Sequence, residues 1–84
     1  MKMEEKIFIL IHSRKIPMRE IEKKTGFDES MLYKLRRGDR KIMNLTIATG
    51  RKFEEYFDYC ESINIISKDD ITIAKLNYEK LQNN

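Results

Sequence analysis

The sequence predicts an all-α protein, a compact bundle of about five helices that contains a helix-turn-helix and ends in a C-terminal helical extension. Apolar residues recur every three or four positions along most of the 84 residues, which is the period of an amphipathic helix. Pro17, Gly26 and Gly38 interrupt this pattern and divide the first half into short segments. We therefore predict a helix-turn-helix domain over residues 1–60 and a packing or dimerisation helix within residues 61–84.

The first helix is expected over Met3–Arg14, where apolar residues fall at helical spacing. Phe8 and Ile9 make its apolar arc wider than one core face needs. These two side chains therefore either pack deep within the chain or meet a second subunit. Ile16 is the expected break before the second helix, because proline disfavours helix at the residue before it and Pro17 suits the first turn of a new helix.

Residues 18–41 have the pattern of a helix, a tight turn, a second helix and a basic loop. The first of these helices, Pro17–Thr25, is short and ends at Gly26, where a positive φ is expected. Asp28 is the expected N-cap of the next helix, and Gly38 its C-cap. The predicted buried stripe of this second helix consists of Met31, Leu32 and Leu35.

Polar, hydrogen-bonding and basic side chains remain on the outer face of that second helix, as the reading of a DNA groove requires. They are Glu29, Ser30, Tyr33, Lys34, Arg36 and Arg37. In the simpler interpretation the basic residues form a solvated charged face and Tyr33 is a partly buried core tyrosine. Because only Asp39 interrupts the five cations between Lys34 and Lys41, directly after a helix-turn-helix, contact with nucleic acid is favoured.

In the second half of the chain, Asn44 is the expected N-cap of a fourth helix, and Gly50 inside it suggests close approach to a neighbouring helix. Ile71–Leu81 can form a helix capped by Asp69 or Asp70, or the return strand of a hairpin. Its richness in helix formers and its lack of a breaker favour the helix. The apolar face predicted for the fourth helix consists of Leu45, Ala48, Phe53, Tyr56 and Phe57.

Positive charge gathers in the first half of the chain. The net charge is +3, but residues 1–41 hold 12 of the 17 Lys and Arg residues and 7 of the 14 Asp and Glu residues. This asymmetry favours an anionic partner for the half that contains the helix-turn-helix. Cys60, the only cysteine, cannot form an intramolecular disulfide and is expected to be a small buried hydrophobe. His12 is expected at the surface.

Several classes of function find no support in the sequence. The longest apolar run, residues 7–11, is far shorter than the ~20 residues that span a bilayer. No signal peptide is evident, so we expect a cytoplasmic protein without a membrane partner. There is no glycine-rich phosphate loop, no nucleophile beside a candidate base and no metal-ligand spacing. We therefore expect neither an enzyme nor a bound metal or other cofactor.

The features around the turn also match a known pattern of turn glycine, hydrophobe, cap, polar positions, paired hydrophobes and terminal glycine with a basic residue. Through them, the stretch from about Ile11 to Tyr56 resembles the lambda-repressor/Cro-like (XRE-type) helix-turn-helix family. This resemblance implies an all-α DNA-binding domain that acts as a dimeric repressor or activator on a palindromic operator, a type common in phages and mobile elements. The matching residues are Ile21, Gly26, Phe27, Ser30, Leu32, Tyr33, Lys34, Leu35, Gly38 and Arg40.

The resemblance also implies roles for individual residues, since phosphate contacts position a protein on DNA and base contacts specify sequence. Glu22 stands where the family usually has a small residue, and we expect its stem to pack while its carboxylate reaches solvent. The implied base-reading residues are Glu29, Ser30, Tyr33 and Lys34, and the implied phosphate-contacting residues are Arg19, Arg36, Arg37, Arg40 and Lys41.

The expected partner is thus double-stranded DNA, and the expected assembly is a homodimer. We expect the apolar residues of the tail to pack over the first helix and to supply the two-fold interface. Asp28 and Glu29 place two carboxylates at the N-terminus of the second helix of the helix-turn-helix, which is the one expected to contact bases, and there they repel phosphate. They support a second hypothesis, in which the chain is a protein-interaction module on the same fold, such as an antitoxin or an inhibitor of a host enzyme.

Overall fold

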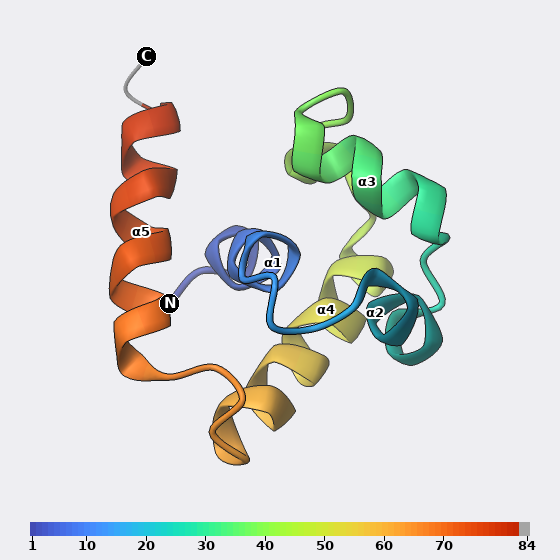
Figure 1. Ribbon diagram of the computed structural model, residues 1–84. Helices are drawn as coiled ribbons and strands as arrows, with labels where there is room; N and C mark the ends of the chain where they lie inside the picture. The colour runs from blue at the N-terminus through green and yellow to red at the C-terminus, as the bar shows by residue number, and fades with distance from the viewer. Residues whose placement is uncertain (83–84) are drawn as a thin grey trace.

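The computed structural model describes residues 1–82, with side chains through residue 80, and it confirms the all-α fold. Among these residues there is no strand, so the hairpin considered for the C-terminal part is wrong. Figure 1 shows the arrangement of the helices. The five α-helices are α1 (Met3–His12), α2 (Met18–Thr25), α3 (Glu29–Arg37), α4 (Ile47–Ser62) and α5 (Lys68–Gln82), with a short 3₁₀ helix η1 (Ile42–Asn44) between α3 and α4.

Helix α1 lies at the centre of the bundle, between α5 on one side and α3 and α4 on the other (Figure 1). Its residues from Ile7 to Ile11 are all buried. Phe8 and Ile9 are covered by the chain itself, so the alternative that they meet a second subunit is wrong. The edge of the Phe8 ring meets the ring of Tyr78 in α5, with 5.3 Å between the ring centroids. The tail therefore packs over the first helix, as predicted.

The connection from α1 to α2 contains a sharp change of chain direction. Helix α1 ends at His12, two residues before the predicted end. Arg14 adopts a left-handed conformation with φ of 61°, which a helix cannot continue through. Ile16 is only 4% exposed, so the predicted break also anchors the connection in the core. Pro17 is the N-cap residue of α2 and not its first helical residue.

Helix α4 begins later than predicted because Thr46, and not Asn44, caps it. The Thr46 Oγ1 accepts a hydrogen bond from the backbone N–H of Thr49 at 3.2 Å. Asn44 lies in η1 instead. Ala48, which was predicted on the apolar face, is exposed, because it lies five residues before buried Phe53 and so on another side of α4. The buried residues of α4 are Gly50, Phe53, Phe57 and Cys60.

Gly50 lies at the crossing of α4 and α1, which confirms the predicted close approach. A Cβ atom at this position would lie 2.5 Å from the Sδ of Met3. That distance is shorter than a van der Waals contact, so α1 and α4 approach more closely here than an alanine would permit without displacing Met3.

A capping box starts helix α5. The backbone N–H of Ser67 donates to Asp70 Oδ2 at 2.9 Å, and the backbone N–H of Asp70 donates to Ser67 Oγ at 3.3 Å. Lys15 Nζ also donates to Asp70 Oδ2 and so links α5 to the α1–α2 connection. Asp70 thus has a capping role, but Asp69 is an exposed residue of the helix. On the predicted stripe, Ile71, Ala74 and Tyr78 are half-buried, whereas the side chain of Leu81 lies outside those described.

None of the helices within residues 1–82 combines the length and the apolar character needed to cross a membrane.

Candidate nucleic-acid interface

Helices α2 and α3 form the predicted helix-turn-helix. Gly26 ends α2 with a φ of 72°, the left-handed conformation that glycine adopts without a Cβ clash. Thr25 is buried in the turn, where its Oγ1 donates to the carbonyl of Ile21 at 2.7 Å and accepts from the N–H of Phe27 at 3.2 Å. Ile21 and Leu32 are fully buried, and they fix the two helices against the core. The angle between the helices is therefore held by buried contacts and not by the loop alone.

The N-terminus of α3 is capped from the neighbouring helix. Glu22 of α2 accepts a hydrogen bond from the backbone N–H of Glu29 on its Oε2, at 2.8 Å. Glu22 is half-buried, so its carboxylate both reaches the surface and caps α3, and the capping role was not predicted. Asp28 occupies the N-cap position, but its side chain makes no capping bond and instead accepts from the hydroxyl of Ser30. This hydrogen bond holds the pKa of the Asp28 carboxyl below its ordinary value.

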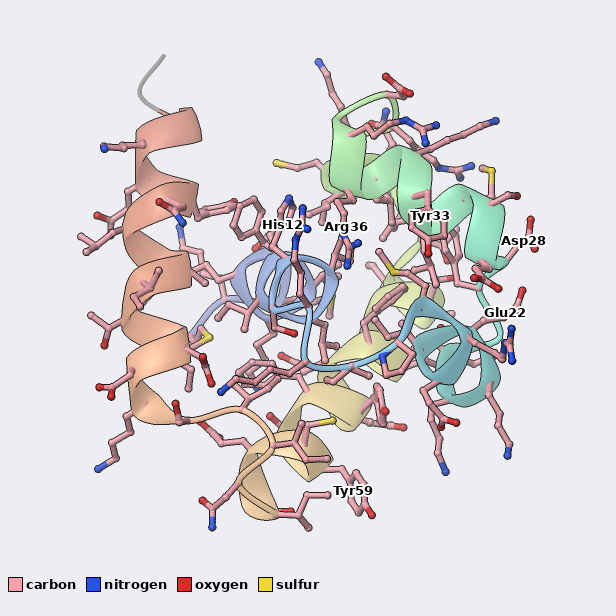
Figure 2. All side chains as sticks on the ribbon, viewed as in Figure 1. His12, Glu22, Asp28, Tyr33, Arg36 and Tyr59 are labelled. Atoms are coloured by element: carbon pink, nitrogen blue, oxygen red, sulfur yellow. The ribbon has the colours of Figure 1, made fainter. Side chains whose placement is uncertain are left out.

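The expected base-reading residues lie along one side of α3. Ser30, Tyr33 and Lys34 are exposed, and Glu29 is half-buried. Tyr33 is 40% exposed, so the alternative of a core tyrosine is wrong. Figure 2 shows Tyr33 on α3, with Asp28 just before the start of that helix. The hydroxyl, phenol and ammonium groups of α3 thus occupy a surface that a ligand can reach.

Arg36 differs from its expected position on the outer face. Its Nε and Nη2 both donate to the carbonyl of Ile11, at 2.9 and 2.6 Å. That carbonyl belongs to the last turn of α1, where helix carbonyls lack intrahelical partners. Burial lowers the pKa of the Arg36 guanidinium below its ordinary value, with a smaller effect from the charge of Arg14. Figure 2 shows Arg36 directed from α3 toward α1, so this residue fastens the two helices together.

The remaining predicted cations lie at the C-terminal end of α3, in the loop that follows, and on α2. Arg19, Lys34, Arg37 and Lys41 are exposed, and Arg40 is half-buried. Arg37 Nε donates to Asp39 Oδ2 at 3.0 Å, but both side chains are more than half exposed, so this ion pair adds little stability. The guanidinium of Arg40 lies over the Phe27 ring, 5.5 Å from its centroid. We call Arg37, Arg40 and Lys41 the basic exit of α3, and the structure brings them together, since all three line one cleft.

A cleft of about 710 Å³ adjoins this basic surface, between the exit of α3 and helix α5. Among the described residues its lining contains no acidic side chain, so it extends the positive surface from α3 toward the centre of the bundle. His12 belongs to this lining and is half-buried, so it reaches the surface only in part; its ring stacks on Phe8 with 4.0 Å between the centroids. The lining residues are Phe8, His12, Leu35, Arg36, Arg37, Gly38, Arg40, Lys41, Ile42, Met43 and Tyr78.

The described residues form no cluster of three or more His, Cys, Asp or Glu side chains that could hold a metal ion. Cys60 is fully buried, as predicted, and burial raises the pKa of its thiol, with an opposing effect from neighbouring Tyr56. A buried thiol with a raised pKa is a poor nucleophile.

Sequence reasoning named Glu22 and Arg36 but missed the contacts by which they organise this surface. Both act over a distance in sequence, Glu22 on a residue seven positions later and Arg36 on a residue 25 positions earlier. The only signal for Glu22 was its departure from a small residue at a tight helix crossing. Comparison with protein-family models, with curated proteins and with solved structures gave no match to this chain.

Proposed function

We propose that this chain is a sequence-specific double-stranded-DNA-binding regulator of transcription, a repressor of the phage or mobile-element type that works in the cytoplasm. The proposal includes a homodimer that binds a palindromic site. A single observation carries it: the exposed side of α3 presents Ser30, Tyr33 and Lys34 next to the basic exit of the same helix. The major groove of B-DNA admits one α-helix, and hydrogen-bonding groups on that helix can read base edges there.

The charges at the two ends of α3 suggest how the helix lies on DNA. Asp28 and Glu29 lie at its N-terminal end, and Arg37, Arg40 and Lys41 lie at or beyond its C-terminal end. Since phosphate contacts supply most of the affinity, the attraction to DNA comes chiefly from the back of α3 and the loop. Arg19, exposed near the start of α2, supports a second contact with the backbone. The N-terminal end of α3 then contributes to discrimination between base sequences. A carboxylate there accepts a hydrogen bond only from a base that offers a donor, such as cytosine.

Selection of binding sites from a random DNA library tests this proposal. We expect one short palindromic sequence to be enriched and bound with nanomolar affinity at moderate salt, and the affinity to fall steeply as salt rises. Failure to enrich any sequence, together with binding that does not depend on salt, would refute it.

A pair of lysine variants makes the test specific to the α3 exit. Lys41→Ala should weaken binding to all sequences and reduce the slope of log affinity against log salt by about 1. Lys68→Ala is the matched control, because Lys68 is also exposed but begins α5 at the opposite end of the molecule (Figure 1). Equal losses in the two variants would mean that the attraction is not located at the exit of α3.

A second candidate function is a protein-interaction module, as in an antitoxin or an inhibitor of a host enzyme. The carboxylates at the N-terminal end of α3 favour it, since Asp28 is exposed and its hydrogen bond with Ser30 lowers the pKa of its carboxyl. Purification of the chain from its native cells distinguishes the two functions. A stoichiometric protein partner that binds through α3, with no DNA bound, would favour the interaction module.

A further inference from the structure

The outer side of helix α5 carries a row of four residues, Asp69, Ile73, Leu76 and Lys80, which we call the outer row. Their spacing of four, three and four residues places them on one face of a helix. All four side chains are exposed, and Ile73 and Leu76 are 60% and 59% exposed. The outer row therefore has two adjacent apolar residues at its centre, an acid at one end and a base at the other.

The opposite side of α5 is already occupied by contacts with the rest of the chain. Tyr78 packs against Phe8, Asp70 accepts from Lys15, and Lys75 Nζ lies 3.9 Å from Glu5 Oε2. These contacts fix the orientation of α5, so the outer row lies on its solvent-exposed side, with Ile73 and Lys80 also at the rim of a groove between α5 and α1. Within the described residues, neither Asp69 nor Lys80 forms an ion pair. Both charged ends of the row are thus available to a partner.

We propose that the outer row pairs with the outer row of a second copy of this chain, with the two α5 helices antiparallel. A two-fold axis between Ile73 and Leu76 places Ile73 of each copy against Leu76 of the other. The same axis places Asp69 of each copy opposite Lys80 of the other, because both pairs are centred on the same point of the helix. The four apolar side chains are then buried together, and an ion pair between Asp69 of one copy and Lys80 of the other flanks them at each end.

The charge pattern selects this orientation over the parallel one. In a parallel pair, Asp69 would meet Asp69 and Lys80 would meet Lys80, and both contacts would repel. An arrangement that is self-complementary only when antiparallel is what an isologous interface requires. The occupant that fits the outer row is therefore a second copy of the same helix.

The position of α5 leaves α3 free in such a dimer. Helix α1 lies between α5 and α3, so pairing through the outer row covers neither Tyr33 nor the basic exit of α3 (Figure 1). One helix pair buries less surface than a standard protein–protein interface. We therefore expect a micromolar dimer in solution that DNA strengthens; the strengthening rests on the proposed function, whereas pairing in solution does not.

Sedimentation equilibrium of the full chain without DNA tests the pairing. The wild-type chain should pass from monomer to dimer in the micromolar range, and Ile73→Glu should weaken dimerisation at least tenfold. Ile47→Glu is the matched control, because Ile47 is 68% exposed at the start of α4 and outside the outer row. A wild-type chain that stays monomeric up to about 1 mM, or equal losses in both variants, would overturn the proposal.

Charge reversal tests the antiparallel orientation. Asp69→Lys alone and Lys80→Asp alone should each weaken the dimer, because each creates like-charge contacts with the second copy. The two changes combined in one chain should restore it. The combined variant carries both unfavourable helix-end charges, so its recovery cannot reflect a more stable helix. If the combined variant dimerises no better than either single variant, the antiparallel pairing is wrong.

The dimer interface and the proposed DNA-binding function can each fail independently of the other. A chain that dimerises through the outer row but shows no salt-dependent DNA binding refutes the DNA-binding function and leaves this interface standing. A chain that binds a single half-site while Ile73→Glu has no effect on its mass refutes the interface and leaves DNA binding standing.

Discussion

The carboxylate of Glu22 in α2 accepts a hydrogen bond from the backbone N–H of Glu29, the first residue of α3, at 2.8 Å. This bond satisfies one of the four N–H groups that a helix start leaves without an intrahelical partner. It also places a negative charge at the positive end of the α3 dipole. The orientation of α3 relative to α2 therefore depends on a side chain from α2 as well as on the turn between them.

Replacing Glu22 should destabilise the protein through the loss of this cap. We expect Glu22→Ala to lower the free energy of unfolding by about 1 kcal/mol and Glu22→Gln, which keeps a hydrogen-bond acceptor, by roughly half as much. Chemical denaturation measures both. Glu55→Ala on the exposed side of α4 is the control, and a loss as large as that of Glu22→Ala would contradict the capping role.

Adjacent arginines in α3 should have separate roles. Arg36 makes two hydrogen bonds to the carbonyl of Ile11, whereas Arg37 is exposed and pairs only with exposed Asp39. A lysine has a single nitrogen and cannot donate to the Ile11 carbonyl from two nitrogens as arginine does. Arg36→Lys should therefore lower the free energy of unfolding by about 1.5–3 kcal/mol. Arg37→Lys should leave stability within about 0.5 kcal/mol of wild type.

DNA binding provides the complementary measurement for the exposed arginine. At a temperature where the variant is folded, Arg37→Ala should weaken DNA binding for all sequences, as expected for a phosphate contact. A stable Arg36→Lys chain, or a destabilised Arg37→Lys chain, would show that the two roles are assigned the wrong way round.

The helices and their breaks could be predicted from the sequence because they depend on neighbouring residues. The positive φ of Gly26 and Gly38 follows directly from glycine at the end of a periodic segment. The start of α4 was misplaced because Asn44 and Thr46 are both good caps, and the choice depends on how Ile42 and Leu45 pack against the core. Local propensity cannot decide between two caps that lie two residues apart.

The candidate site was predictable only where exposure follows from helical period. Ser30 and Lys34 fall on the outer side of α3 by spacing alone. Arg36 was predicted on the outer side as well, but it follows buried Leu32 by four residues, so spacing places it beside the buried stripe, from which its side chain reaches the end of α1. The two carboxylates of Glu22 and Asp70 likewise act on partners chosen by the tertiary fold. Contacts of this kind require the packed structure.

Acid should weaken the start of α5 through Asp70. Donation from Lys15 Nζ, followed by hydrogen bonds from Ser67, lowers the pKa of the Asp70 carboxyl to about 2. A pKa lower in the folded state than in the unfolded state contributes stability that is fully present above about pH 4 and is lost as the pH falls toward 2.

Asp70→Asn should therefore reduce stability at neutral pH and flatten the fall in unfolding free energy between about pH 4 and pH 2. Thermal unfolding followed by circular dichroism at a series of pH values measures this slope. Asp69→Asn, on the exposed side of the same turn, should change the slope less. The same slope in Asp70→Asn and wild type would show that Asp70 is not the group whose protonation weakens α5.

Gly50 and Met3 should be energetically coupled. A Cβ at position 50 would lie 2.5 Å from Met3 Sδ, so Gly50→Ala in the wild-type chain must displace the Met3 side chain. In a Met3→Ala background the space is open, and Gly50→Ala should stabilise the protein by about 1 kcal/mol through helix propensity. A double-mutant cycle measured by chemical denaturation should give a coupling of about 0.5 kcal/mol or more. Equal effects of Gly50→Ala in both backgrounds would contradict the close approach.

The front of α3 should discriminate between DNA sequences at a cost in affinity. Glu29 carries a negative charge at the first residue of α3, on the side where Ser30 and Tyr33 are exposed. Glu29→Gln removes repulsion from phosphate, so binding to random-sequence DNA should strengthen several-fold. The amide can donate as well as accept, so the preference for a cytosine donor at the contacted position should weaken.

Competition between the selected site and random DNA measures both effects of Glu29→Gln. The ratio of the two affinities should fall, while Glu55→Gln on α4 should leave it unchanged. If Glu29→Gln instead strengthened binding to the selected site and to random DNA by the same factor, Glu29 would act only as a repelling charge and would take no part in reading the sequence.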